Sequence, residues 1–511
     1  MIGRRSPSVD GALTTVLVVG AGALVLSLVA ISSSNANTSA LTPSAVPGGQ
    51  VTTTTTNNAG PSTTLPGQQR SGSTGNSGGS ATNQTATNPV PAGVSCAPGR
   101  NGGGTDRGVS ATTIHLGATI VSSGIGASFL GPVRIGINAV KDKVNRAGGI
   151  CGRQLDVKLV DDGWQPTLGY DYIRNMVEGN KVFALAVDPS SEGLRLASNA
   201  GYFAKTQTPV VGTDGMLNSQ YVDPWVWPVA ASTVSTMHIM AYDAYHRLNA
   251  RNFSIIFDSK YHFGVEGAFA FNAAVKRLTG KDIPGYFKPG SSDTCVDRFC
   301  AISAGQSSYA NANQSFNNKC FPSSNPNESC DFVALLLEPT EAETFLRGGF
   351  ARQFAAGMGF AQTLFTRDFA QACGSICGGA HVWTGYNPPE GQFAALPAVA
   401  QYVKDVKAED SSADVDNQFL EGGYSGMELM VAALQKVGPV LSRAALVSTL
   451  NSMNYDNGLS AALQWRPGHH NANVQMQSFT IQYQNGFNGF RSDGVGWVKD
   501  PWVGQDTSGG N

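Results

Sequence analysis

Charged residues are scarce in this sequence. They make up 14% of its 511 residues, with 34 Lys and Arg against 36 Asp and Glu and a formal net charge of −2. This balance excludes a dominant basic tract for nucleic acid and an acidic tail, so bulk charge does not indicate a partner and no nucleic acid is expected. Hydrophobic residues reach 41%, which is enough to build cores and excludes a wholly disordered chain.

Sequence motifs of catalysis are absent or incomplete. There is no P-loop and no H-E-x-x-H sequence. The run GGYSGM at 422–427 does not complete a G-x-S-x-G nucleophile motif, because Met427 stands where the second glycine is needed. The run GIGAS lacks the third glycine of a dinucleotide-binding loop, where Phe129 stands. We therefore expect no enzyme and no cofactor, and a hydrolase ranks last among the possible functions.

Charged residues are rarest near the N-terminus, where Arg70 is the only one between positions 11 and 99. Residues 13–31 form an uncharged, largely apolar run, and about 20 such residues span a bilayer as a helix. Arg4 and Arg5 precede this run, which predicts a cytoplasmic N-terminus and an exported remainder. Residues 1–31 are thus predicted to be a signal or anchor segment, with an uncleaved membrane anchor favoured over a cleaved signal.

A low-complexity segment follows the apolar run. Residues 32–108 are rich in Ser, Thr, Gly and Pro and include five successive threonines at 52–56. Such a composition buries too little apolar surface to offset the entropy lost on ordering. We expect a disordered stalk that tethers the rest of the chain to the membrane.

Eight cysteines are expected on the exported side, where disulfides persist. Local spacing favours the pairs Cys295 with Cys300, Cys320 with Cys330, and Cys373 with Cys377, which leaves Cys96 for Cys151. A zinc site at Cys373, Cys377 and His381 is the alternative. It is the weaker one, because the chain has no paired C-x-x-C units.

From residue 111 onward, short β-rich runs alternate with amphipathic ones. Residues 112–121 and 155–162 read as strands, and Val133, Ile137 and Val140 recur between them at helical spacing. Further strands are expected at 182–187, 208–212, 253–258, 331–338 and 362–366. This order predicts an α/β protein with two doubly wound lobes, each a parallel sheet with helices on both faces. In such sheets, ligands bind at the loops beyond the carboxyl ends of the strands.

One segment of the chain resembles the sequence signature of a known protein family. Residues 145–166, NRAGGICGRQLDVKLVDDGWQP, resemble the N-x-x-G-G-I…D-D-x-x-x-P signature of substrate-binding proteins of ABC transporters of the branched-chain amino-acid (Leu/Ile/Val-binding) type. IHLGATIVSSGIGASFLGPVRIGINAV before the signature and FALAVDPSSEG and FLEGGYSGMELMVAALQKVG after it are similar to the same family. The resemblance covers residues 111–499 and implies a type I periplasmic-binding-protein fold, in which two lobes joined by a three-crossing hinge close on a ligand.

The resemblance also implies boundaries and a function. It places the N-terminal lobe at 109–231 plus 388–460 and the C-terminal lobe at 232–387 plus 461–505. The expected function is extracytoplasmic capture of a small amino-acid-like or amide-like solute for amino-acid transport by an ABC permease and ATPase. A sensory or interaction module of the same fold on the cell surface is the alternative.

Carried over residue by residue, the family's ligand contacts fall on loops of both lobes. In the N-terminal lobe they fall on Ser123, Gly124, Phe129, Ser190, Ser191, Thr213 and Asp214. Among these, Phe129 is expected to form an apolar wall, and Ser190 and Ser191 are expected to bind a carboxylate.

In the C-terminal lobe the same transfer selects Tyr261 and Phe263 as aromatic contacts. The family's ammonium-binding acid falls on Asp368, with Glu338 as a second acidic candidate. No metal ligand is expected.

Overall fold

The structure is a computed structural model that describes residues 100–286, 295–350, 354–466, 469–470 and 474–506. The predicted membrane segment, the stalk up to residue 99 and Cys96 lie outside the described residues. Within the described ranges, no helix combines the length and hydrophobicity needed to cross a membrane.

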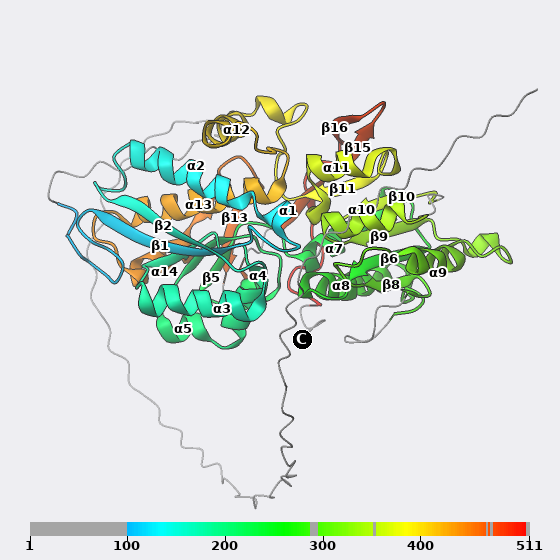
Figure 1. Cartoon of the computed structure of the whole chain (residues 1–511), viewed down its shortest axis with the longest axis horizontal. Coiled ribbons are helices and arrows are strands. Elements are labelled where there is room, and N and C mark those ends of the chain that lie inside the picture. Colours follow the sequence, from blue (N-terminus) through cyan, green and yellow to red (C-terminus); the bar gives the residue numbers. More distant parts are fainter. Residues whose placement is uncertain (1–99, 287–294, 351–353, 467–468, 471–473, 507–511) are drawn as a thin grey trace, which may run out of the picture. The chain divides into compact units, whose positions relative to one another are not determined.

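The first lobe is built on a five-stranded parallel sheet in the order β2-β1-β3-β4-β5. Its strands are β1 (Thr113–Ile120), β2 (Gln154–Asp161), β3 (Ala184–Ala186), β4 (Val210–Thr213) and β5 (Val226–Pro228). Its helices are α1 (Ala127–Leu130), α2 (Val133–Arg146), α3 (Pro166–Arg174), α4 (Ser191–Asn199), α5 (Tyr202–Thr206), α6 (Ser219–Val222), α12 (Pro397–Glu409), α13 (Gln418–Val437) and α14 (Arg443–Ser452). Figure 1 shows α2 and α13 on one face of this sheet and α3 and α5 on the other.

Helix α2 packs closely on α13. Its residues Val133, Ile137 and Val140 are buried, as their helical spacing predicts. A Cβ atom added at Gly136 would lie 2.5 Å from the backbone nitrogen of Tyr424 on α13. The glycine therefore allows the two helix backbones to approach each other, which joins a late segment of the chain to the first lobe.

The second lobe contains a nine-stranded sheet in the order β16-β15-β11-β10-β9-β6-β8-β7, with β17 paired to β15. Its strands are β6 (Phe253–Asp258), β7 (Cys295–Val296), β8 (Phe299–Ile302), β9 (Phe332–Leu336), β10 (Gly357–Phe360), β11 (His381–Thr384), β15 (Gln475–Tyr483), β16 (Phe487–Ser492) and β17 (Val498–Lys499). Its helices are α7 (Thr233–His246), α8 (His262–Thr279), α9 (Ala310–Cys320), α10 (Pro339–Arg347) and α11 (Arg367–Cys373). The strands from β8 to β11 are parallel, and β15 runs antiparallel to β11.

The chain passes between the two sheets three times: after β5, after β11, and before β15. A small sheet of β12 (Asn454–Tyr455), β13 (Leu463–Arg466) and β14 (His469–His470) precedes the last passage. This sheet lies against the first lobe, where Trp465 Nε1 donates to the Pro228 carbonyl at 3.0 Å. Two α/β lobes with a three-crossing connection are thus confirmed.

One predicted strand is wrong. The structure places β10 at Gly357–Phe360, and Gln362–Leu364 form a 3₁₀ turn instead of the strand expected at 362–366. The strand contains Gly359, where an added Cβ would lie 2.4 Å from the Phe332 ring. Packing of that ring requires a glycine in the strand, although glycine weakens the strand signal in a sequence.

Three predicted disulfides are confirmed: Cys295–Cys300, Cys320–Cys330 and Cys373–Cys377. Cys151 is also disulfide-bonded. The alternative of a zinc site at Cys373 and Cys377 finds no support, since both thiols are oxidised and the described residues contain no group of three or more side chains able to hold a metal ion.

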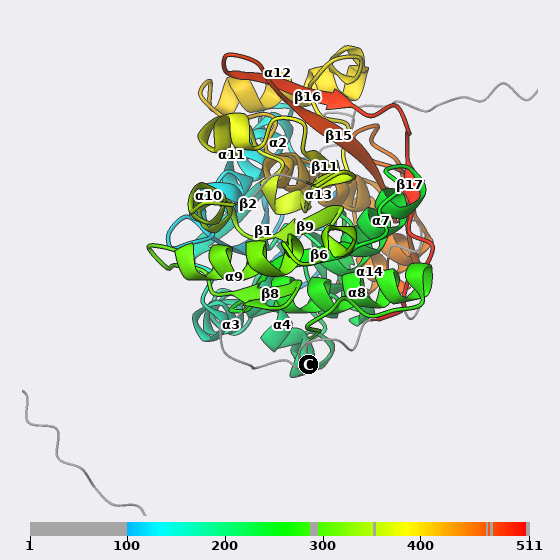
Figure 2. The same ribbon diagram turned by 90° about the vertical axis from the view of Figure 1, so that its right-hand side faces the viewer.

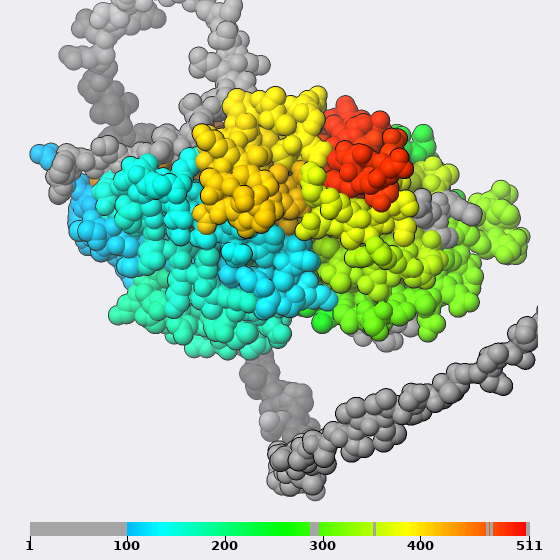
Figure 3. Space-filling view, turned by 45° about the horizontal axis from the view of Figure 1, so that its top comes forward, coloured from blue at the N-terminus to red at the C-terminus, as the bar shows by residue number. Residues whose placement is uncertain are grey.

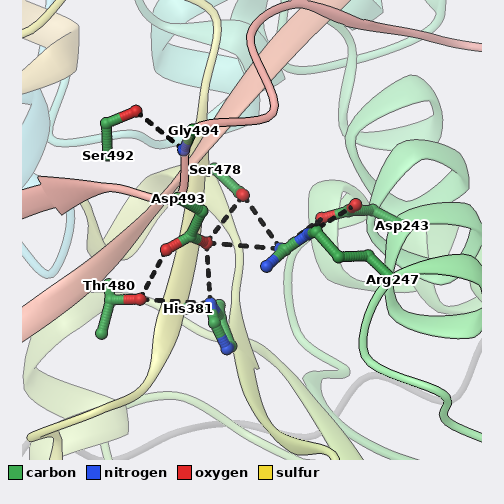
Figure 4. A network of polar contacts seen from close by, with 8 residues as sticks. All are labelled: Asp243, Arg247, His381, Ser478, Thr480, Ser492, Asp493 and Gly494. Atoms are coloured by element: carbon green, nitrogen blue, oxygen red, sulfur yellow. Dashed lines mark hydrogen bonds and ion pairs between the residues drawn. The ribbon is translucent and has the colours of Figure 1, made fainter.

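A polar network fastens the C-terminal hairpin to the second sheet (Figures 2 and 4). The Asp493 carboxylate, just after β16, lies 2.8 Å from His381 Nδ1 of β11 and accepts a hydrogen bond from Ser478 Oγ of β15 at 2.8 Å. Arg247, just after α7, approaches the same carboxylate at 3.3 Å. Burial favours the neutral acid, but bonds from His381 and its neighbours lower the pKa of Asp493 to about 2.

Candidate functional site

Acidic side chains stand at the carboxyl ends of strands in both sheets. Asp162 follows β2, Asp188 lies two residues beyond β3, and Asp214 follows β4. In the second sheet Asp258 ends β6 and Glu338 lies just beyond β9. All five are at most 8% exposed. The sheet edges where the resemblance places the ligand are therefore buried and acidic.

An aromatic stack joins the two lobes at this place. The indole of Trp164, in the loop between β2 and α3, lies 4.2 Å from the ring of Tyr261 in the second lobe, with 13° between the planes. Phe263 lies 5.7 Å away, and Phe129 meets the indole edge-on at 5.6 Å. Trp164 Nε1 donates to Ser191 Oγ at 3.1 Å. Four of the predicted ligand residues thus surround one side chain, Trp164, that the sequence interpretation did not select.

An ion pair forms a second link between the lobes. Glu192, in the first turn of α4, lies 2.9 Å from His262 Nδ1 and accepts the His262 backbone N–H at 2.8 Å. Arg195 Nε approaches the same carboxylate at 3.3 Å. Burial works against the ionised form, but the contacts with His262 and Arg195 hold the pKa of Glu192 below its usual value. Figure 3 shows blue and cyan atoms of the first lobe directly beside green and yellow-green atoms of the second lobe.

Other predicted residues of the first lobe lie around this core. Ser190 is fully buried and lies close enough to Asp162 to favour the ionised form of that acid, whereas Ser123 and Gly124 are exposed. Thr213 is fully buried. Asp214 accepts hydrogen bonds from the Met216 backbone and the Gln220 side chain, and burial raises its pKa to about 7.

The two acidic candidates of the second lobe lie in different surroundings. Glu338 is 1% exposed, caps α10 by accepting the Thr340 N–H at 2.9 Å, and its charge helps burial to raise the pKa of Tyr261. Asp368 is exposed in the first turn of α11, close enough to Asp414 to raise the pKa of that acid. The structure therefore brings Glu338, and not Asp368, to the aromatic stack.

The error in the predicted position of strand β10 explains why Asp368 was selected for the site. Because β10 ends at Phe360, the position just beyond its carboxyl end is near Gln362, whereas Asp368 is in the next helix. Gln362 is 2% exposed and donates from Nε2 to the Ala231 carbonyl at 3.3 Å. A strand boundary placed correctly would have drawn attention to Gln362.

The acids of the site titrate close to neutrality. Burial raises the pKa of Asp162 to about 6, Asp258 to about 7 and Asp188 to about 8. A cationic group among them would favour their ionised forms, because opposite charges attract strongly in a poorly solvated site. The site is thus suited to a group such as a ligand ammonium.

The chain belongs to the periplasmic binding protein family, whose pattern matches residues 113–487. This family consists of substrate-binding proteins, and membership implies an extracytoplasmic location. The family and fold expected from the signature are confirmed. No curated protein matches the chain.

Solved structures share this fold. A possible leucine/isoleucine/valine-binding protein from Rhodopirellula baltica is 17% identical, with a TM-score of 0.59 over 74% of this chain and 96% of its own. LivJ of Streptococcus pneumoniae, a branched-chain amino acid transporter substrate-binding protein in complex with isoleucine, is 14% identical, with a TM-score of 0.59 over 76% and 100%. A fatty acid ABC transporter substrate-binding protein from Thermomonospora curvata is 15% identical, with a TM-score of 0.60 over 79% and 95%. Since these proteins are named for different ligands, the fold alone does not identify the ligand of this chain.

Proposed function

We propose that this protein captures a small amino-acid-like or amide-like solute between its two lobes and delivers it to an ABC importer. Ser190 and Ser191 would bind the carboxylate or amide end of the solute. Glu338, with Tyr261 beside it, would bind the amino end. Residues 13–31 would anchor the chain in the membrane and residues 32–108 would form its tether.

The observation that carries this proposal is the meeting of side chains from the strand ends of both lobes. Ser191 and Glu192 start α4 of the first lobe, and Tyr261 directly precedes α8 of the second, which starts at His262. Hydroxyl, carboxylate and aromatic groups converge there within one buried region. This combination of an apolar wall with a few placed polar groups is typical of small-molecule sites.

Calorimetric titration of the full chain with the twenty amino acids and their amides tests the proposal. At least one should bind, and Ser191→Ala should weaken that binding about tenfold or more, because a buried polar group of the ligand would lose its partner. Ser448→Ala, an exposed serine on α14, serves as the matched control and should leave affinity unchanged. Absence of binding by the whole panel, or equal affinity in Ser191→Ala, would contradict the proposal.

A further inference from the structure

Trp164 is held inward by its own loop. Its φ is +62°, in the left-handed region that bulky residues rarely adopt. Its backbone N–H donates to Asp162 Oδ1 at 2.9 Å. A Cβ added at Gly126 would lie only 3.0 Å from the indole, so the glycine leaves space for the ring. The side chain is 1% exposed. Several local features therefore direct this indole into the region between the lobes.

The indole contacts two of the residues that are predicted to bind the ligand. Its N–H bonds the Ser191 hydroxyl, and its flat face lies against Tyr261. The separation of 4.2 Å between the ring centroids is van der Waals contact, which leaves no room for another layer of atoms between the two rings. In this structure Trp164 is therefore an occupant of the site rather than one wall of an open pocket.

We propose that Trp164 is a built-in occupant of the ligand pocket, and that a ligand must displace its indole in order to bind. This inference rests on the proposed function, because it assigns the occupant of the same site. It has a consequence for selectivity. Only a ligand that interacts with Ser191 and Tyr261 more favourably than the indole does can shift the protein to the form in which the indole is displaced.

Removal of the indole provides the test. We expect Trp164→Ala, in the full chain, to bind L-tryptophan in calorimetry at least tenfold more tightly than the wild type, because the free amino acid supplies the missing ring while its ammonium and carboxylate face the polar groups of the site. Trp164→Leu removes part of the same volume while keeping an apolar side chain, and should change the affinity in the same direction if Trp164→Ala does not fold.

Trp227→Ala is the matched control. Trp227 is also fully buried, on β5, with its Nε1 bonded to Asn451 at 3.1 Å. The space it vacates lies in the packed lobe, where a zwitterion would lose its hydration without compensation, so L-tryptophan should not bind there more tightly than to the wild type. Thermal unfolding confirms that each variant is folded before titration.

The outcomes separate this inference from the proposed function. If the wild type binds L-tryptophan as tightly as the folded Trp164 variants do, or if those variants gain no affinity, Trp164 is not an occupant and the inference is overturned. The proposed function still stands in that case if the wild type binds another member of the amino-acid panel. If the Trp164 variants bind L-tryptophan and the wild type binds no member of the panel, Trp164 is an occupant of the site. The proposed function as an amino-acid-binding protein is then contradicted.

Discussion

Asp188 illustrates how single residues set the charge of the interlobe region. Its carboxyl group is fully buried and accepts the backbone N–H of Thr119 at 2.9 Å and also the Thr119 hydroxyl. These bonds favour the ionised form, but burial outweighs them and raises the pKa of Asp188 to about 8. At neutral pH this acid is therefore mainly protonated. Glu192, whose pKa is lowered, and Glu338, whose pKa is about 6, both carry charge near Tyr261.

A matched pair of substitutions tests which acid binds a ligand ammonium. Glu338→Gln should weaken binding of an amine-bearing ligand about tenfold to a hundredfold, because it removes a buried charge beside Tyr261. Asp368→Asn, at an exposed position on α11, should change affinity less than twofold. Calorimetry with the best ligand of the amino-acid panel measures both. The reverse order of effects would return the role to Asp368.

At the scale of elements, the C-terminal segment is fixed on α7 and α8 by a buried histidine. His238 of α7 is fully buried, with Nδ1 3.2 Å from Asp500 and Nε2 2.9 Å from Asp506. Arg277 of α8 binds Asp506 as well. Burial disfavours the imidazolium, but the two carboxylates outweigh it and raise the pKa of His238.

This arrangement predicts a pH-dependent contribution to stability. Because the pKa of His238 is raised by folding, its contribution is fully present below the unfolded value of about 6.5 and is lost as the pH rises through the folded value. Urea unfolding should therefore show His238→Gln less stable than the wild type by about 1–3 kcal/mol at pH 5.5, with a smaller difference at pH 8.5. His246→Gln, exposed at the end of the same helix, should show no such trend. A constant difference for His238→Gln would refute the coupling.

The hairpin β15–β16 depends on Asp493 in the opposite pH range. Since the pKa of Asp493 is lowered to about 2, its contribution is present above the unfolded value of about 4 and is lost as the pH falls towards 2. Asp493→Asn should lower the free energy of unfolding at pH 7 by about 2–4 kcal/mol, because His381 and Arg247 lose a buried partner. Asp171→Asn, which removes an exposed ion-pair partner, should change it by less than about 0.5 kcal/mol. Equal effects of the two substitutions would contradict the role of the network.

At the scale of the whole molecule, the fold could be predicted from the sequence to a large extent, because most strands and helices carry clear periodicity. Helix α2 buries the residues that its spacing selects. Strand β10 was missed because it contains Gly357, whose φ is +97°, and Gly359, which leaves space for the Phe332 ring. A packing requirement of this kind is invisible until the neighbouring elements are in place.

The site was predictable in part. Residues that start helices after strands, such as Ser191 and Tyr261, were selected, and the structure brings them together through Trp164. Trp164 itself lies at a variable position of the family signature, and its inward direction depends on a left-handed backbone and on contacts across the lobes. Pairings such as Glu192 with His262 likewise depend on how the lobes meet, which local sequence patterns do not encode.

Hydrogen exchange of the full chain, with and without the pooled amino acids and amides, tests most directly whether both lobes hold the ligand. We expect the ligand to slow exchange both in residues 188–193 of the first lobe and in residues 258–264 of the second. Protection of neither segment, or of one alone, would contradict binding between the lobes.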